Sequence, residues 1–247
     1  MSSGLVIVLG SFWMSLMALV GASTLLLPPR LLQQLLMPWV SLAAGTLLGG
    51  ALFHMLPEGF AVMPLLQAAA WLAAGFTAFL ALEIFMHWHH SHRKKSFALV
   101  SPSSTQSQSL PFLILLGDTL HNLVCGLGVT STFLIQPTAG IAVWLAAVAH
   151  EIPQEFGDFG LLLHSGWTPR RALFWNFISA LTFPVGALLA WNFQHVLPLA
   201  PVVLFAAGNY LYIAASDLVP EIKTQVSLQR AMTSFGWFLG GLLLLWR

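Results

Sequence analysis

The stretch HEIPQEFGDF, residues 150–159, places one imidazole and three carboxylates inside an apolar run that opens at Ala139. An ionisable group at the centre of a bilayer costs at least ~2.5 kcal/mol and is by default a functional hypothesis. The whole chain is 57% hydrophobic and only 7% charged, whereas an ordinary soluble domain has roughly 25% charged residues. The composition therefore indicates an integral membrane protein whose few charges have a purpose.

Apolar runs long enough for a membrane helix, about 20 residues each, recur along the sequence. We expect an all-α polytopic fold in which residues 1–247 form a single transmembrane domain. The eight predicted spans cover residues 5–27, 36–58, 64–88, 110–134, 140–164, 170–193, 199–219 and 229–246. Between the third and fourth spans, the polar segment 91–109 is expected to be a flexible cytoplasmic loop.

Charge placement predicts the orientation, because basic residues in short loops stay preferentially on the cytoplasmic side. Eight of the nine basic residues fall in loops that an eight-span chain places on one face: Arg30, Arg93, Lys94, Lys95, Arg170, Arg171, Lys223 and Arg230. Both termini are therefore expected outside. The formal net charge of +1 argues against a nucleic-acid partner, and the small size without added domains favours a bacterial inner membrane.

Polar residues in the fourth and fifth spans recur at helical spacing. At 100° per residue, one face of the fourth span carries Asp118, His121, Asn122 and Cys125. An arc of about 140° on the fifth span carries His150, Glu151, Gln154, Glu155 and Asp158. A short loop makes these helices antiparallel, so the two faces can meet. Imidazole, carboxylate, amide and thiolate together suit a borderline divalent cation such as Zn²⁺.

Pro153 lies inside the fifth span and removes the backbone donor that the carbonyl of Ala149 would otherwise use. Kinked or broken membrane helices commonly accompany ion sites, and a simple packing kink is the alternative interpretation.

Two short motifs echo each other near the ends of the second and seventh spans. FHMLPE (53–58) and SDLVPE (216–221) share a polar residue, two apolar residues, proline and glutamate. The expected topology places them at opposite surfaces, as inverted repeats would. We interpret His54 and Glu58 as an outer approach to the metal, and Asp217 with Glu221 as an inner exit.

The motif GDTLHNLVCG (117–126) followed by HEIPQEFGDF resembles the paired metal-site motifs of the ZIP (ZRT/IRT-like) metal transporters. HMLPE (54–58), NFISALT (176–182) and AAGNYLYIAASDLVPE (206–221) are similar to other stretches of that family. The resemblance implies an eight-helix carrier, often a homodimer, that moves zinc into the cytoplasm by alternating access. It also implies inverted repeats of helices 1–3 and 6–8 around helices 4 and 5.

The same resemblance implies metal ligands at His121, Asn122, His150 and Glu151, with Asp118, Glu155 and Asp158 beside them. Asn176 and Ser179 would complete a second metal position. Two residues depart from the family pattern: Cys125 stands where the family has Asp or Glu, and Gln154 where it has His or Glu. We therefore expect one good site around His121, His150 and Glu151, and a second that is weakened or absent.

Several alternatives stay open at this point. Zn²⁺, Cd²⁺, Fe²⁺ and Mn²⁺ overlap in such ligand sets. A membrane metal sensor of the same fold would bind metal without moving it, because Cys125 and Gln154 alter the ligands. His150-Glu151 also begins the His-Glu-x-x-His pattern of zinc hydrolases, but Gln154 stands where the second histidine belongs, so we expect no enzyme.

Overall fold

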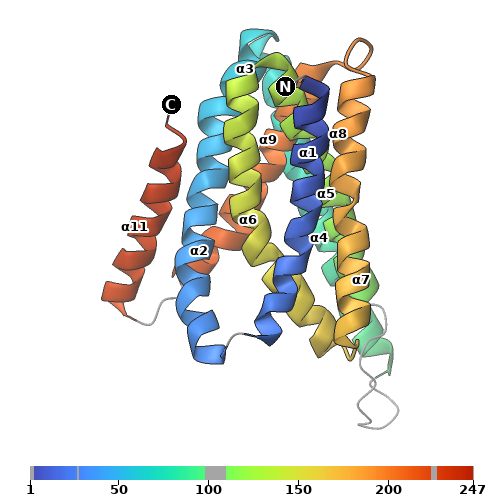
Figure 1. The fold of residues 1–247 in the computed structure, drawn as a ribbon, viewed down its shortest axis with the longest axis vertical. Coiled ribbons are helices and arrows are strands. Elements are labelled where there is room, and N and C mark those ends of the chain that lie inside the picture. The colour runs from blue at the N-terminus through green and yellow to red at the C-terminus, as the bar shows by residue number, and fades with distance from the viewer. Residues whose placement is uncertain (1–2, 27, 98–109, 224–226, 247) are drawn as a thin grey trace.

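The computed structural model describes residues 3–26, 28–97, 110–223 and 227–246. Every regular element among these residues is helical, and the long helices lie side by side along the long axis of the molecule (Figure 1). The elements join end to end into eight helical segments. These are α1 (Ser3–Leu16) with the 3₁₀ helix η1 (Met17–Leu25); α2 (Pro29–Gly49) with the π-helix η2 (Gly50–Met55) and α3 (Leu56–Ala61); α4 (Leu65–Phe97); α5 (Leu110–Ile135); α6 (Pro137–His164); α7 (Pro169–Ala180) with α8 (Thr182–Asn192); α9 (Leu199–Tyr212) with the π-helix η3 (Ile213–Leu218) and α10 (Val219–Lys223); and α11 (Leu228–Leu244).

Each segment overlaps one of the eight predicted ranges. Among the described residues, six stretches are long and apolar enough to cross a membrane: Ser3–Ser23, Gln34–Ala61, Leu65–Phe85, Pro111–Ile135, Pro169–Asn192 and Leu199–Leu218. The two remaining long helices are α6, which carries the three carboxylates of the 150–159 stretch, and α11, which has 17 residues. Helix α4 continues to Phe97, so residues 91–97 of the predicted loop are helical. Residues 98–109 of that loop lie outside the described part.

The start of α1 and the end of α11 lie at the same end of the bundle (Figure 1). We call this the terminal end and the other the far end. Helices α2, α5, α7 and α11 begin at the far end, and α4, α6 and α9 run toward it. The exposed residues Arg170, Arg171 and Arg230 therefore sit at the far end, where α7 and α11 begin.

Both copies of the echoed motif overlap the second half of a π-helix at the same register. Each π segment ends two residues before a proline, at Pro57 in the first copy and Pro220 in the second. A proline lacks a backbone N–H, and its ring clashes with the carbonyl four residues earlier, which here belongs to Phe53 or Ser216. The wider i to i+5 turn of a π-helix accommodates that carbonyl. The two motifs are therefore similar in backbone conformation as well as in sequence.

Helix α6 passes through Pro153 without interruption, and a neighbouring helix supplies the donor that the proline removes. The indole Nε1 of Trp39, on α2, donates a hydrogen bond of 2.9 Å to the carbonyl of Ala149. The carbonyl that the sequence analysis expected to lack an intrahelical donor is thus bonded across the helix interface.

Glycines bring three pairs of helices into backbone contact. A Cβ at Gly75 would lie 1.9 Å from the carbonyl oxygen of Phe205, and one at Gly208 would lie 2.2 Å from that of Leu72. This reciprocal pairing joins α4 to α9. Small residues allow membrane helices to approach this closely. The same arrangement joins α2 to α11 through Gly45 and Gly241, and α5 to α8 through Gly126 and Gly186.

Candidate metal centre

The polar faces of α5 and α6 meet inside the bundle. His121 Nε2 and His150 Nε2 lie 3.0 Å apart, and Glu151 Oε2 lies 3.9 and 3.8 Å from them. All three side chains are buried. A tetrahedral zinc ion with bonds of about 2.0–2.1 Å separates neighbouring ligand atoms by about 3.3 Å. The three atoms are therefore already spaced for one cation.

Cys125 lies one helical turn beyond His121 on α5. Its thiol and one nitrogen of each of the two imidazoles lie within 4.8 Å of one another. The sulfur is 3.1 Å from the hydroxyl of Tyr210, on α9, and both residues are buried. A fourth donor is thus available to a cation held by the two histidines.

A second group of ligands lies beside the first and consists of oxygen atoms. Oxygens of Asp118, Glu151 and Glu155 lie within 4.8 Å of one another. Asn176, on α7, donates from Nδ2 to Glu155 Oε2. Glu151 is a member of this oxygen group and also lies beside the two imidazoles, so the two sets of ligands are contiguous.

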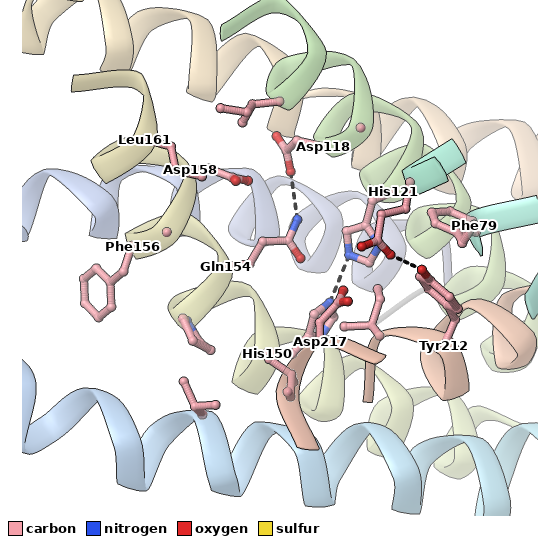
Figure 2. A pocket seen from close by; sticks show the side chains of 18 of the residues that line it. Phe79, Asp118, His121, His150, Gln154, Phe156, Asp158, Leu161, Tyr212 and Asp217 are labelled. Carbon is pink, nitrogen blue, oxygen red and sulfur yellow. Dashed lines mark hydrogen bonds between the residues drawn. The ribbon is translucent and has the colours of Figure 1, made fainter. Parts of the chain in front are cut away.

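Asp118 ties three helices together by accepting three hydrogen bonds. Its donors are Asn122 Nδ2 at 2.8 Å, Gln154 Nε2 at 3.1 Å and Ser179 Oγ at 2.5 Å. Figure 2 shows the Gln154 amide directed at the Asp118 carboxylate. The two predicted amide ligands, Asn122 and Gln154, therefore have their N–H groups turned to Asp118, which leaves only their carbonyl oxygens to bind metal.

Several buried oxygens at this place have no hydrogen-bond partner among the described residues. They are both carboxylate oxygens of Glu151, Oε1 of Glu155 and Oδ1 of Asn176. A buried acceptor left unpaired costs about 1–3 kcal/mol, and more if it is charged. A cation among these oxygens would satisfy them, so the site has the electrostatics of a cation-binding centre.

The centre lies at the boundary between a cavity and an apolar layer. A cavity of about 750 Å³ extends from His121 and His150 between α2, α4, α5, α6 and η3, and Asp158 and Asp217 also line it. Figure 2 shows these four side chains around the same space. The lining residues belong to the far half of each helix. The cavity therefore extends from the imidazoles toward the far end.

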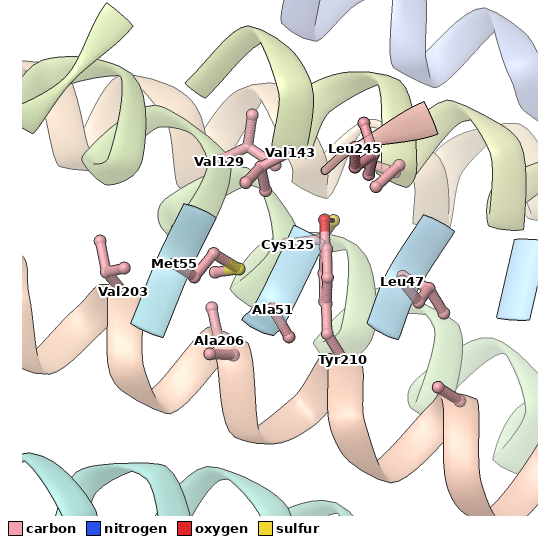
Figure 3. Packing of buried hydrophobic residues seen from close by; sticks show 14 of the residues in the cluster. Leu47, Ala51, Met55, Cys125, Val129, Val143, Val203, Ala206, Tyr210 and Leu245 are labelled. Carbon is pink, nitrogen blue, oxygen red and sulfur yellow. Dashed lines mark hydrogen bonds between the residues drawn. The ribbon is translucent and has the colours of Figure 1, made fainter. Parts of the chain in front are cut away.

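On the terminal side of the centre, buried apolar side chains close the bundle. Figure 3 shows this apolar layer, formed by Leu47, Ala51, Met55, Val129, Val143, Val203, Ala206 and Leu245 around Cys125 and Tyr210. Most of these residues are less than 2% exposed, so the layer separates the metal centre from the terminal end.

The remaining predicted site residues lie at several places. His54 is buried and bonds through Nε2, at 3.0 Å, to the carbonyl of Leu245 after the end of α11. Asp158 and Asp217 line the cavity. The side chain of Glu221 lies outside the described residues.

Sequence reasoning missed three contributors from other helices. Asn209 and Tyr210, on α9, contact His121 and Cys125. In the cavity, Tyr212 donates a hydrogen bond to Glu83, on α4. Two signals pointed to Asn209. It lies within AAGNYLYIAASDLVPE (206–221), one of the family-like stretches, and it is a lone amide within an apolar span, a type of residue that is rarely placed in a membrane without a partner.

Comparison with known proteins identifies the family of the chain. The family model described as ZIP zinc transporter matches residues 100–246. Zinc transporter ZIP4 of Homo sapiens is 29% identical to this chain in an alignment that covers 76% of this chain and 39% of that protein. Zinc transporter ZIP13 of Pongo abelii is 31% identical over 210 residues, 78% of this chain and 60% of that protein.

The metal cation symporter ZIP14 of Xenopus tropicalis is 27% identical to this chain in an alignment that covers 77% of this chain and 55% of that protein. In each case the chain spans less than two thirds of the relative's length. The family match covers more than half of this chain and includes both helices of the metal centre. The protein is an integral membrane protein that belongs to the ZIP zinc transporter family.

Proposed function

We propose that this protein is a carrier that moves divalent metal cations, Zn²⁺ above all, across the membrane into the cytoplasm by alternating access. The observation that carries the proposal is the convergence of His121, His150 and Glu151 at the boundary between an open cavity and an apolar layer. A carrier needs a buried site that one side of the membrane can reach at a time, and we propose that this is such a site. We propose no enzymatic activity.

Charge and packing support the proposed topology of eight spans with both termini outside. The far end carries exposed basic residues, which favours the cytoplasm on that side. Helix pairing supports inverted repeats of helices 1–3 and 6–8. Helix α2 packs on α11 and α6, and its counterpart α9 packs on α4 and α5. The two π segments at equivalent registers add a second line of support.

In the proposed mechanism, the cation enters from the terminal side past His54 and Glu58. It exchanges its water for the two imidazoles and Glu151, and the unpartnered carboxylate oxygens offset its charge. It then leaves through the cavity past Asp158 and Asp217. Because the cavity extends from the centre toward the far end, we assign this conformation to the release of metal into the cytoplasm.

The ligand chemistry also sets the proposed substrate range. Imidazole and thiolate ligands suit Zn²⁺ and Cd²⁺, whereas carboxylate and carbonyl oxygens suit Mn²⁺. The first group of ligands, with Cys125, therefore favours Zn²⁺ and Cd²⁺. The oxygen group around Glu155 and Asn176 lets Mn²⁺ and Fe²⁺ compete. The bacterial inner membrane and the homodimer stay predictions from the sequence.

Uptake of ⁶⁵Zn²⁺ into liposomes that contain the purified protein tests the proposal. Wild type and His195→Ala, which alters an exposed histidine, are expected to accumulate zinc, and His150→Ala is expected to lose at least ~100-fold in zinc affinity, more than a change beyond the ligands costs. Zinc binding without uptake by wild type would instead identify a metal sensor. The absence of both zinc binding and zinc uptake in wild type would refute the proposal.

A further inference from the structure

The ring of His121 is held from outside the two metal-binding helices. Asn209, on α9, places its amide Nδ2 3.2 Å from His121 Nδ1, and Asn209 is 0% exposed. Phe79, on α4, packs edge-on against the same ring, with centroids 6.3 Å apart and an interplanar angle of 87°. The imidazole is therefore held in position, and its polar neighbour at Nδ1 among the described residues is an amide.

Hydrogen-bond chemistry then assigns the protons of both rings. An amide nitrogen only donates, so His121 Nδ1 accepts, and the proton of this neutral ring is on Nε2. That Nε2–H donates to His150 Nε2 at 3.0 Å. His150 Nδ1 lies 3.1 Å from the carbonyl of Ala146, which only accepts, so Nδ1 donates. Every ring nitrogen has one consistent role.

A cation between the two rings requires a different arrangement. It needs the lone pair of Nε2 from both histidines. His150 already has the required tautomer, since its proton is on Nδ1. The proton of His121 must move from Nε2 to Nδ1, and an N–H at Nδ1 cannot face the N–H of an amide. The neighbour of His121 must then present an acceptor.

Asn209 can present that acceptor without moving its backbone. Its Oδ1 is buried and has no hydrogen-bond partner among the described residues. Rotation of the amide about its last side-chain bond exchanges the nitrogen and the oxygen, and the oxygen then accepts from Nδ1–H. A metal-bound histidine is usually oriented by such an acceptor on its second nitrogen.

We propose that Asn209 is a positioning residue of the metal centre, and that its amide turns over when metal binds and turns back when metal leaves. This inference rests on the proposed metal-binding function. Both rings stay neutral in the two arrangements, and each arrangement leaves one polar group of Asn209 without a partner. The two orientations are therefore close in energy, which suits a ligand that must release its cation in every cycle.

Two substitutions separate this role from a purely structural one. Asn209→Leu removes both the donor and the acceptor, so the Kd for Zn²⁺ and the KM of uptake should rise about 10–100-fold. Asn209→Asp offers only an acceptor and holds His121 in the metal-binding tautomer. Its KM should fall and its maximal rate should fall with it. Asn192→Leu makes the same change at an exposed position and should behave as wild type.

Nitrogen NMR of ¹⁵N-histidine-labelled protein in lipid gives a direct readout, with His121 assigned by the loss of its signals in His121→Ala. We expect the proton on Nε2 before Zn²⁺ is added and on Nδ1 afterwards. A proton on Nδ1 in both states, or a parallel loss of affinity and rate in both Asn209 variants, would overturn the inference. If saturating Zn²⁺ leaves the His121 signals of the wild-type protein unchanged, the proposed metal-binding function is refuted instead. Should Asn209→Leu not fold, the NMR result and Asn209→Asp still decide.

Discussion

The thiol of Cys125 and the hydroxyl of Tyr210 lie 3.1 Å apart, where the metal centre meets the apolar layer. The ring of Tyr210 also packs against His150, with centroids 5.6 Å apart at 62°. Tyr210 therefore contacts both a proposed ligand and the layer that closes the terminal side (Figure 3).

Cys125, which stands where the family pattern has Asp or Glu, predicts the metal preference. Cys125→Asp replaces a soft thiolate ligand by a hard carboxylate, so inhibition of ⁶⁵Zn²⁺ uptake by Cd²⁺ should weaken and inhibition by Mn²⁺ should strengthen. Cys125→Ser, which keeps the size of the side chain, should lose Cd²⁺ inhibition without gaining Mn²⁺ inhibition. An unchanged order of inhibition in both variants would show that Cys125 does not touch the cation.

The three hydrogen bonds to Asp118 predict that a substitution of this residue lowers zinc affinity even though both imidazoles are unchanged. In Asp118→Leu, both accepting oxygens are removed, so Asn122, Gln154 and Ser179 all lose this hydrogen-bond partner. We expect zinc affinity to fall about 10–100-fold, measured by equilibrium binding in detergent. Ser179→Ala removes only one donor and should have a smaller effect. Equal affinities for wild type and Asp118→Leu would contradict the assigned role.

The contact between α4 and α9 predicts a strong effect of one methyl group. Gly75→Ala would put a Cβ 1.9 Å from the carbonyl oxygen of Phe205, and overpacking of this kind costs about 1–3 kcal/mol or more. The thermal unfolding midpoint in detergent should fall clearly. Gly236→Ala adds the same methyl group on α11 with nothing within 4 Å, and it should leave the midpoint unchanged.

The position of the cavity predicts which residues solvent reaches. In a Cys125→Ser background, Ile114→Cys lines the cavity and Val143→Cys lies in the apolar layer. A membrane-impermeant maleimide applied from the far side should label the first and leave the second unmodified. Labelling of Val143→Cys from either side at a similar rate would mean that the layer does not close the bundle.

The metal centre was predictable to the extent that it follows helical spacing. Residues three and four apart share a helix face, and this rule alone selects His121 and His150 for facing positions. The rule carries no information about which third helix covers the pair. Asn209 is 88 residues from His121 along the chain, and its place is set by packing of α9 against α5, which no local pattern encodes.

The fold shows the same division between local and distant causes. The eight segments follow from the lengths of the apolar runs, and the prolines at 57 and 220 mark the irregular turns. The extension of α4 to Phe97 was not predicted, because hydropathy marks where a helix leaves the bilayer and not where its backbone hydrogen bonds stop. The glycine contacts were likewise hidden, since a glycine in an apolar run does not reveal which backbone approaches it.

The bond between Trp39 and the Ala149 carbonyl gives α6 a point of attachment that can be undone. A carbonyl engaged within its own helix could not serve this way, since releasing it would unwind a turn. Here a single bond of about 0.5–1.5 kcal/mol net fastens α2 to the residue just before His150. A movement of α2 that breaks this hydrogen bond would leave the backbone hydrogen bonds of α6 intact. Pro153 thereby makes possible a reversible contact between α2 and α6 beside the metal centre.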